Sequence, residues 1–274
     1  MSDLFGKSYQ VWRVGIEKPE LVEGYIENKM KLSYFDNKKS APLILFIHGT
    51  ASAHEMWDRQ YKSLSATHFR VIGIDLRGHG KSSNPGGACN LDDHISDLKE
   101  TLDHIEIKEP IAIVGHSFGA ILAVKFAEKY PELVSRLLLV SLPARVPWIL
   151  IKYYKWLLGK PLEILNKKIN LILKLPVKRR LKLAISTDIN IIREIWRESM
   201  KWDFLNQVPK INCPVYLSVG RFDYVALRSM VKRLHQELPN SSYKVFNWSS
   251  HTCMEDEPAE FNNWVLSSLA LPVR

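Results

Sequence analysis

Residues 113–119 read Ile-Val-Gly-His-Ser-Phe-Gly, and this run contains a Gly-x-Ser-x-Gly motif made by Gly115, Ser117 and Gly119. An apolar, strand-like run (110–114) precedes the motif, and an apolar, helix-like run (120–130) follows it. A serine at such a sharp strand-to-helix turn adopts a strained backbone conformation, and small residues two positions before and after it let the chains pass. The turn lifts the hydroxyl clear of the sheet and points the first amides of the helix toward whatever the serine attacks. The stretch therefore predicts a serine nucleophile, with a glycine-rich structural turn as the alternative.

A serine nucleophile needs a histidine base, and after a turn of this kind the base comes late in the chain. Of the nine histidines, two follow Ser117, namely His235 and His251. His235 lies in a helical pattern among charged neighbours, which is typical of a solvated helix position. His251 follows a strand-like run (243–248) and precedes a helix start, and loops at strand ends are where α/β sheets place catalytic groups. We therefore expect His251 to be the base.

The carboxylate that holds the histidine should follow an earlier strand. Residues 214–219 form a compact β-type run, and Gly220-Arg221-Phe222-Asp223 comes directly after it. Asp223 is the one carboxylate between positions 220 and 226, and the loop after the preceding strand, 141–145, has none. The pattern predicts Asp223 as the acid, with a turn aspartate that caps the following helix as the alternative.

The oxyanion that forms during attack on a carbonyl needs two N–H donors. One comes from the residue after the nucleophile and the other from a loop that follows an earlier strand. The apolar run 43–47 is a strong strand candidate and ends in His48-Gly49-Thr50-Ala51. The main-chain N–H groups of Thr50 and Phe118 are therefore the expected oxyanion hole, and His48 is expected to be a structural loop histidine.

Motifs spread over nearly the whole chain resemble those of the α/β-hydrolase fold superfamily. They are His48-Gly49, the segment Asp75-Leu76-Arg77-Gly78-His79-Gly80-Lys81-Ser82, the motif around Ser117, Gly220-x-x-Asp223, and His251 with the downstream Glu257-Pro258. The resemblance implies an α/β fold with a mainly parallel, eight-stranded, doubly wound sheet and an inserted helical cap. It also implies Ser117 as nucleophile, Asp223 as acid and His251 as base. Residues 75–82 form a structural loop in these proteins, so Asp75, Arg77 and His79 are expected to be positioning residues.

Within that superfamily the chain is most similar to serine-nucleophile esterases, lipases and thioesterases. Relatives that cleave epoxides or carbon–halogen bonds carry an aspartate at the nucleophile position, which is Ser117 here. The expected activity is hydrolysis of a carboxylic ester or thioester with an apolar acyl group, with no metal or organic cofactor. His251 and Asp256 form a His-x-x-x-x-Asp pattern that resembles one found in some acyltransferases. An acyltransferase, a C–C bond hydrolase and a non-catalytic ligand receptor on the same fold are the alternatives.

The order of sequence patterns agrees with a sheet covered by helices on both faces. Strands are expected at 10–16, 21–27, 29–34, 43–47, 70–74, 111–114, 136–140, 215–219 and 243–247, and helices at 91–105, 118–130, 226–238 and 259–269. The alternation breaks between 144 and 210, where helix-like runs are punctuated by prolines. The expected organisation is a core domain in two parts, 1–144 and 211–274, with a helical cap at 145–210.

The positive charge of the chain is concentrated in this cap. Residues 145–210 contain 15 Lys and Arg against 5 Asp and Glu, a balance of +10, whereas the whole chain is +9. A basic segment interleaved with Ile, Leu, Trp and Tyr suits an anionic membrane surface or an acidic acyl carrier, and a solvated surface is the alternative. Three cysteines indicate no disulfide framework, and the N-terminus lacks an apolar signal core. We expect a cytoplasmic protein, peripheral at a membrane, that does not bind nucleic acid.

Overall fold

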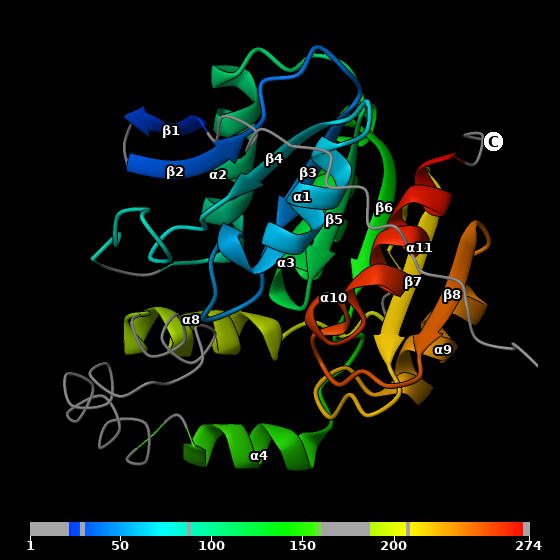
Figure 1. Cartoon of the computed structure of the whole chain (residues 1–274). Coiled ribbons are helices and arrows are strands. Elements are labelled where there is room, and N and C mark those ends of the chain that lie inside the picture. The colour runs from blue at the N-terminus through cyan, green and yellow to red at the C-terminus, as the bar shows by residue number, and fades with distance from the viewer. Residues whose placement is uncertain are drawn as a thin grey trace, which may run out of the picture.

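The computed structural model describes residues 22–27, 31–86, 89–157, 159, 187–206 and 209–270. Its centre is one eight-stranded sheet in the order β1-β2-β4-β3-β5-β6-β7-β8 (Figure 1). The strands are β1 (Val22–Glu27), β2 (Lys31–Asp36), β3 (Leu43–Ile47), β4 (Arg70–Ile74), β5 (Ile111–His116), β6 (Val134–Val140), β7 (Val215–Gly220) and β8 (Ser241–Phe246). β2 pairs antiparallel with both β1 and β4, and all the other pairs are parallel. The predicted fold class is confirmed, and the strand expected at 10–16 lies outside the described residues.

Helices cover both faces of the sheet, as the alternation of patterns predicts. They are η1 (His54–Trp57), α1 (Asp58–Ser65), α2 (Leu91–His104), α3 (Phe118–Lys129), η2 (Pro131–Leu133), α4 (Trp148–Leu157), α8 (Ile189–Ser199), α9 (Arg228–Glu237), α10 (Cys253–Asp256) and α11 (Pro258–Ala270). The patterns at 91–105, 118–130, 226–238 and 259–269 correspond to α2, α3, α9 and α11. Helix α1 and the short segments η1, η2 and α10 were not predicted.

Two apolar cores form because side chains alternate between the faces of each strand. In β3, Leu45 and Ile47 pack with residues of α2, α3 and α9, whereas Ile44 and Phe46 pack with residues of α1 and α11. All four side chains are almost fully buried. A strand buried on both faces reads as one continuous apolar run, which is why the sequence pattern marks β3 so clearly.

The register brings the carboxyl ends of the central strands to one edge of the sheet. Ile47 of β3 lies opposite Gly115 of β5, and Val140 of β6 lies opposite both His116 and Ser218. Gly220, at the end of β7, lies opposite Phe246, at the end of β8. The loops that follow β3, β5, β7 and β8 therefore open at the same edge, where open α/β sheets bind their ligands.

The predicted cap falls between β6 and β7, and α4 and α8 are its described helices. Its two ends meet, because Arg145 bridges Asp203 with a 2.8 Å ion pair and the Phe204 N–H donates to the Ala144 carbonyl at 2.8 Å. Helix α8 buries Ile191 and Ile195 in the same apolar cluster as α3. The boundaries 145 and 210 stay a prediction, and within them residue 158, residues 160–186 and residues 207–208 lie outside the described residues.

Candidate active site

Ser117 lies in a tight turn between β5 and α3, with φ 54° and ψ −114°. This is a conformation that residues with side chains rarely adopt, and such strain persists where the surrounding structure enforces it. The two glycines of the motif permit the turn. A Cβ on Gly115 would lie 2.4 Å from the Gly119 carbonyl oxygen, and a Cβ on Gly119 would lie 2.4 Å from the Ile47 carbonyl oxygen. The small residues are therefore required by close backbone contacts, as the motif predicts.

Ser117, His251 and Asp223 form a continuous chain of hydrogen bonds. The Ser117 Oγ lies 3.0 Å from the His251 Nε2, and the His251 Nδ1 lies 3.0 Å from each carboxylate oxygen of Asp223. A carboxylate only accepts, so the Nδ1 facing it carries the proton and the Nε2 is left to accept from the serine hydroxyl. Ser117 and His251 are 134 positions apart in the sequence, and Asp223 and His251 are 28 positions apart. The sheet brings the three side chains together.

The Asp223 carboxylate is also fixed by its own loop. Its Oδ1 accepts from the N–H groups of Val225 at 2.8 Å and Ala226 at 2.9 Å. Asp223 therefore makes the turn contacts expected of a capping residue and the contact with His251 at the same time. The sequence left open whether Asp223 is the acid of the site or a capping aspartate, and these two roles are compatible.

The loops that carry Asp223 and His251 are clamped together by Gly220. A Cβ on Gly220 would lie 1.9 Å from the Ser250 carbonyl oxygen. The neighbouring backbone is paired across the same gap, because the Phe222 N–H donates to the Ser249 carbonyl at 3.0 Å. A side chain at position 220 would separate the base from its carboxylate, which gives the Gly-x-x-Asp spacing a physical reason.

His116 is a residue of the site that the sequence analysis missed. It is buried at the end of β5, and its Nε2 donates to the backbone carbonyl of His251 at 2.8 Å. The two imidazole rings are 4.8 Å apart, centroid to centroid. His116 thus ties the backbone of the expected base to the strand that carries Ser117. The contact spans 135 positions, and no local pattern in the sequence indicates it.

The expected oxyanion donors lie at the start of α3 and in the loop after β3. Phe118 is the first residue of α3, so its N–H has no carbonyl one turn earlier within the helix. The loop after β3 lies against the turn, because a Cβ on Gly49 would lie 3.1 Å from the Ser117 Cβ. Within the described ranges, neither the Thr50 N–H nor the Phe118 N–H donates to another protein group. Both N–H groups are therefore free of other protein acceptors, and their role as oxyanion donors stays a prediction.

Buried neutral histidines hold the loop that carries Thr50. The Ala51 N–H donates to the His79 Nε2 at 3.1 Å, and the Leu76 N–H donates to the His48 Nε2 at 3.0 Å. Burial lowers the pKa of His48 to about 4 and that of His79 to about 3. Both rings are therefore neutral near pH 7, which they must be in order to accept a hydrogen bond.

The segment 75–82 is organised around Asp75 and Arg77. The Asp75 carboxylate accepts from the His54 N–H at 2.8 Å and from the Lys81 N–H at 2.9 Å. Arg77 makes two hydrogen bonds of 2.7 Å to the Asp97 carboxylate on α2. Neither residue contacts Ser117 directly in these interactions. The geometry agrees with positioning roles for Asp75, Arg77 and His79.

Neither His235 nor Cys253 takes part in the hydrogen-bonded chain from Ser117 to Asp223. His235 is on α9, where its Nδ1 lies 2.7 Å from the Ser241 Oγ. Cys253 is fully buried, and burial raises the pKa of its thiol to about 12, so it fills space as an uncharged group.

Within the described residues, no three His, Cys, Asp or Glu side chains converge in a way that could hold a metal ion. No helix of the described residues could span a membrane.

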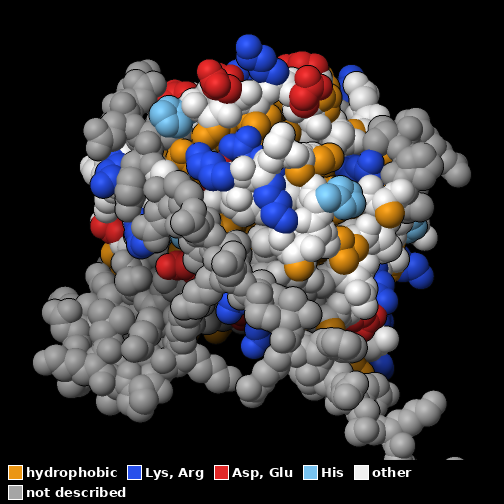
Figure 2. Space-filling view, turned by 45° about the horizontal axis from the view of Figure 1, so that its top comes forward, with side chains coloured by type: hydrophobic (Ala, Val, Ile, Leu, Met, Phe, Trp, Pro, Cys, Tyr) orange, Lys and Arg blue, Asp and Glu red, His pale blue; other side chains and the backbone are white. Residues whose placement is uncertain are grey.

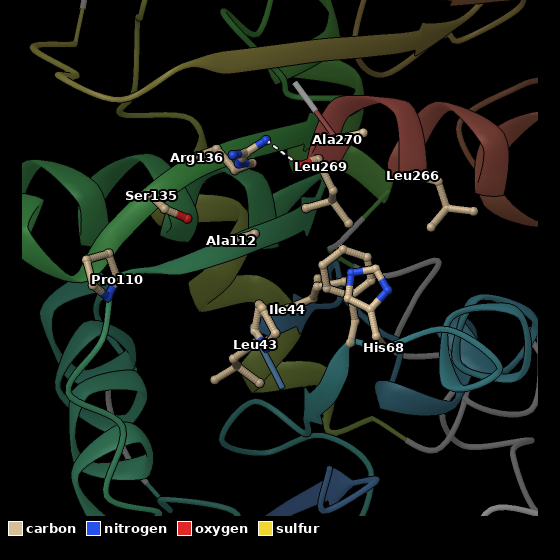
Figure 3. A pocket seen from close by; sticks show the side chains of 12 residues that line it. Leu43, Ile44, His68, Pro110, Ala112, Ser135, Arg136, Leu266, Leu269 and Ala270 are labelled. Atoms are coloured by element: carbon tan, nitrogen blue, oxygen red, sulfur yellow. Dashed lines mark hydrogen bonds between the residues drawn. The ribbon is translucent and has the colours of Figure 1, made fainter. Parts of the chain in front are cut away.

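A cavity of about 630 Å³ lies at the opposite edge of the sheet (Figure 3). Its walls include Leu43 and Ile44 at the start of β3, Ala112 near the start of β5, and Leu269 near the end of α11. The Arg136 guanidinium lies in one wall of the cavity (Figure 3) and donates to the carbonyls of Ser268 at 2.6 Å and Leu269 at 2.9 Å. Arg136 thereby supplies hydrogen-bond donors to two backbone carbonyls in the last turn of α11. This cavity is at the amino ends of the strands, away from Ser117.

Comparison with known proteins identifies the fold. A family described as alpha/beta hydrolase fold matches residues 42–161, which include the β3 loop and the Ser117 turn. An esterase from Thermogutta terrifontis has a similar structure, with a TM-score of 0.75 at 22% sequence identity over 90% of this chain and 98% of that one.

Two curated relatives match over shorter stretches. Epoxide hydrolase 1 of Caenorhabditis elegans is 33% identical over 135 residues, which are 46% of this chain and 33% of that protein. A 1-acylglycerol-3-phosphate O-acyltransferase of Arabidopsis thaliana is 36% identical over 111 residues, or 39% and 26% of the two chains. The matched stretch is thus about a third or less of the length of these relatives. The sheet order, the family match and the structural similarity together show that the chain has the α/β-hydrolase fold.

Proposed function

We propose that the protein is a serine hydrolase that cleaves a carboxylic ester or thioester with an apolar acyl group through an acyl-enzyme on Ser117. The observation that carries the proposal is the chain from the Ser117 Oγ through His251 to Asp223, with 3.0 Å at each contact. It is supported by the strained turn at Ser117, which aims the hydroxyl and the first amide of α3 at the same point.

In the first half of the reaction the Ser117 hydroxyl attacks the carbonyl carbon of the substrate. The His251 Nε2 takes the hydroxyl proton as the Oγ–C bond forms, and Asp223 holds the imidazole and stabilises its positive charge. The Thr50 and Phe118 N–H groups donate to the oxyanion, and each such donor is worth about 3–4 kcal/mol in comparable sites. His251 then gives its proton to the departing alcohol or thiol, and the acyl group remains on Ser117.

In the second half, water releases the acid. The His251 Nε2 takes a proton from the water as its oxygen attacks the acyl carbonyl, and the proton returns to the Ser117 Oγ when the acyl–serine bond breaks. These steps need no metal or organic cofactor. The apolar side chains of the cap favour an apolar acyl group. On the inner side of α4, burial raises the pKa of Tyr154 to about 12, and the nearby Tyr224, Tyr153 and Asp223 add smaller contributions, so this helix lies close to the loop that carries Asp223.

Other activities known on this fold are less well supported here. A serine rather than an aspartate at position 117 argues against epoxide cleavage. The acyltransferase alternative rests on the His251-to-Asp256 spacing. The Asp256 carboxylate accepts from the N–H and the Oγ of Ser250, at 2.9 Å each, and is exposed. These contacts give Asp256 a role in holding the loop beside His251, which a hydrolase needs as much as a transferase.

The test is turnover of p-nitrophenyl esters and acyl thioesters of graded chain length, with and without an alcohol acceptor. We expect free acid as the product, and faster turnover of medium or long acyl chains than of acetyl. A product made only when the alcohol is present would identify a transferase. No turnover of any ester or thioester, together with tight binding of one of them, would favour a receptor.

We further propose that the predicted cap, 145–210, meets an anionic partner. Its balance of +10 stands against a remainder near −1. Charge alone fits an anionic membrane surface and an acidic acyl carrier equally well. Lys and Arg side chains also lie beside Asp and Glu at the end of the molecule opposite α4 (Figure 2), so the cap is distinguished by its excess of positive charge and not by the presence of basic residues.

A further inference from the structure

Helix α4 presents a large apolar and aromatic face to solvent. Trp148, Ile149, Tyr153 and Trp156 are 67%, 61%, 51% and 64% exposed. Two exposed lysines, Lys152 and Lys155, lie among them, and the Lys152 Nζ is 4.9 Å from the centre of the Trp148 ring. The helix contains no Asp or Glu. Exposed tryptophans rarely gather on one helix of a monomer without a partner.

This face cannot turn inward, because the opposite side of α4 is already packed. Tyr154 is buried and stacks on Trp196 of α8 with ring centroids 4.1 Å apart. Helix α8 is in turn anchored in the core through Ile191 and Ile195. The aromatic face of α4 is therefore held at the surface, at the end of the molecule where the β7 and β8 loops carry Asp223 and His251 (Figure 1).

A basic hollow adjoins the aromatic face. Its volume is about 300 Å³, and it is lined by Lys155, Gly159, Arg193, Arg197 and Met200. Lys155 belongs to both features, so the apolar face and the hollow are continuous. Glu194 pairs with Arg197, and none of the described residues that line the hollow is acidic. Guanidinium and ammonium groups in this arrangement fit a phosphate.

We propose that the outward face of α4 docks on an anionic phospholipid bilayer, with the basic hollow beside a lipid head-group phosphate. Trp and Tyr prefer the boundary between acyl chains and head groups, and lysines beside them reach the phosphates. An acidic protein would satisfy the charges but would not require large apolar side chains in this position. That the docked protein takes an apolar acyl ester from the bilayer to Ser117 rests on the proposed function, whereas the docking does not.

The test is co-sedimentation of the full chain with phosphatidylcholine vesicles, with and without about 30% phosphatidylglycerol, at about 0.1 M and 1 M salt. No substrate is present, so a failure of the proposed hydrolysis cannot affect the result. We expect binding to the anionic vesicles at low salt, and much weaker binding at high salt or to phosphatidylcholine alone.

Paired variants separate the two features of the surface. Replacing Lys152 and Lys155 with glutamine should weaken vesicle binding about 30-fold, since each basic residue near an anionic surface contributes about a fivefold factor. Replacing Trp148 and Trp156 with alanine should weaken it about tenfold or more. The matched control is the double variant Lys232→Gln with Arg233→Gln, at an exposed basic pair on α9, which should bind like the unmodified protein.

Three results would overturn the proposal. One is equal binding to neutral and anionic vesicles. Another is an equal loss in the α4 variants and the matched control. The third is capture by an acidic acyl carrier protein, run in parallel, without any binding to vesicles. Circular dichroism and thermal melts, which we expect to be unchanged in the α4 variants, show that these variants are folded.

Discussion

Ser117 acquires its position from its neighbours rather than from any contact of its own side chain with the core. Its positive φ is an uncommon conformation for a serine, and such strain costs about 1–3 kcal/mol, which the surrounding packing must offset. The backbone is held by the Ser117 N–H, which donates to the Val140 carbonyl at 2.9 Å. At the scale of single residues, the site is a strained serine in a rigid frame, facing a histidine that two further groups orient.

The proposed triad predicts a large loss of turnover for single substitutions. We expect Ser117→Ala and His251→Ala each to lower kcat by about 10⁴–10⁶ on a p-nitrophenyl ester, because the three groups act as a unit. Asp223→Asn should lose about 10⁴, because the amide would favour the wrong imidazole tautomer. Circular dichroism and thermal melts should show an intact fold. Ser267→Ala, at an exposed serine of α11, is the control; full turnover in the Ser117→Ala protein would exclude the assignment.

The neutral histidines behind the β3 loop predict a stability that depends on pH. The pKa values of about 4 for His48 and about 3 for His79 are below the ordinary histidine value of 6.5. Between the lowered pKa and pH 6.5, each histidine therefore binds more protons in the unfolded chain than in the folded protein. The free energy of unfolding should therefore be highest above pH 6.5 and decrease as the pH falls toward 4, by about 2 kcal/mol per histidine at pH 5.

Urea unfolding at several pH values measures this effect. In His79→Gln the amide oxygen can still accept from the Ala51 N–H but does not titrate. Burial also lowers the pKa of His94, so about a third of the pH dependence that these three histidines cause should disappear. The same substitution at His235, outside this network, serves as the control. If the free energy of unfolding of His79→Gln depended on pH in the same way as that of the unmodified protein, His79 would not be the source of the effect.

At the scale of elements, the first turn of α3 lies against the end of β3. A Cβ on Gly119 would lie 2.4 Å from the Ile47 carbonyl oxygen and 2.6 Å from that of His48, and neither backbone atom can move without displacing the β3 loop. We expect Gly119→Ala to lower the free energy of unfolding by about 3 kcal/mol and turnover by at least about tenfold.

A substitution at a second glycine, Gly86, serves as the control, because it introduces backbone strain without steric crowding. Gly86 has φ +68°, but nothing lies within 4 Å of the place of its Cβ. Gly86→Ala should therefore cost about 1 kcal/mol, the price of the positive φ alone, and leave turnover unchanged. Equal effects of the two substitutions on stability and turnover would show that the contact between α3 and β3 does not position the site.

The sequence predicts some elements better than others for physical reasons. The bounds of β3 and β4 agree with the prediction, because both are buried, uninterrupted apolar runs. β5 extends two residues further than predicted, since Gly115 and His116 pair with Ile47 and Val140 although neither is a large apolar residue. Helix α1 escapes prediction because its buried positions are Gln60, Tyr61 and Leu64, so only two apolar residues mark its inner face.

At the scale of the whole molecule, the order of strands and loops was predictable and the long-range contacts were not. The parallel sheet determines that loops after β3, β5, β7 and β8 share an edge, so a serine, an aspartate and a histidine at those strand ends could be predicted to meet. The contact between His116 and the His251 backbone depends on side-chain packing across the sheet, which no spacing encodes. The aromatic face of α4 was visible in the sequence as composition, but only its exposure distinguishes it from a buried helix face.

The most direct test of the central claim, that Ser117 is a covalent nucleophile activated by His251 and Asp223, is labelling with a fluorophosphonate followed by intact-mass measurement and peptide mapping. We expect one adduct per chain, on Ser117, with none on the Ser117→Ala protein and slow labelling of the His251→Ala protein. No adduct on the unmodified protein, or equal labelling of the Ser117→Ala protein at another residue, would contradict the account.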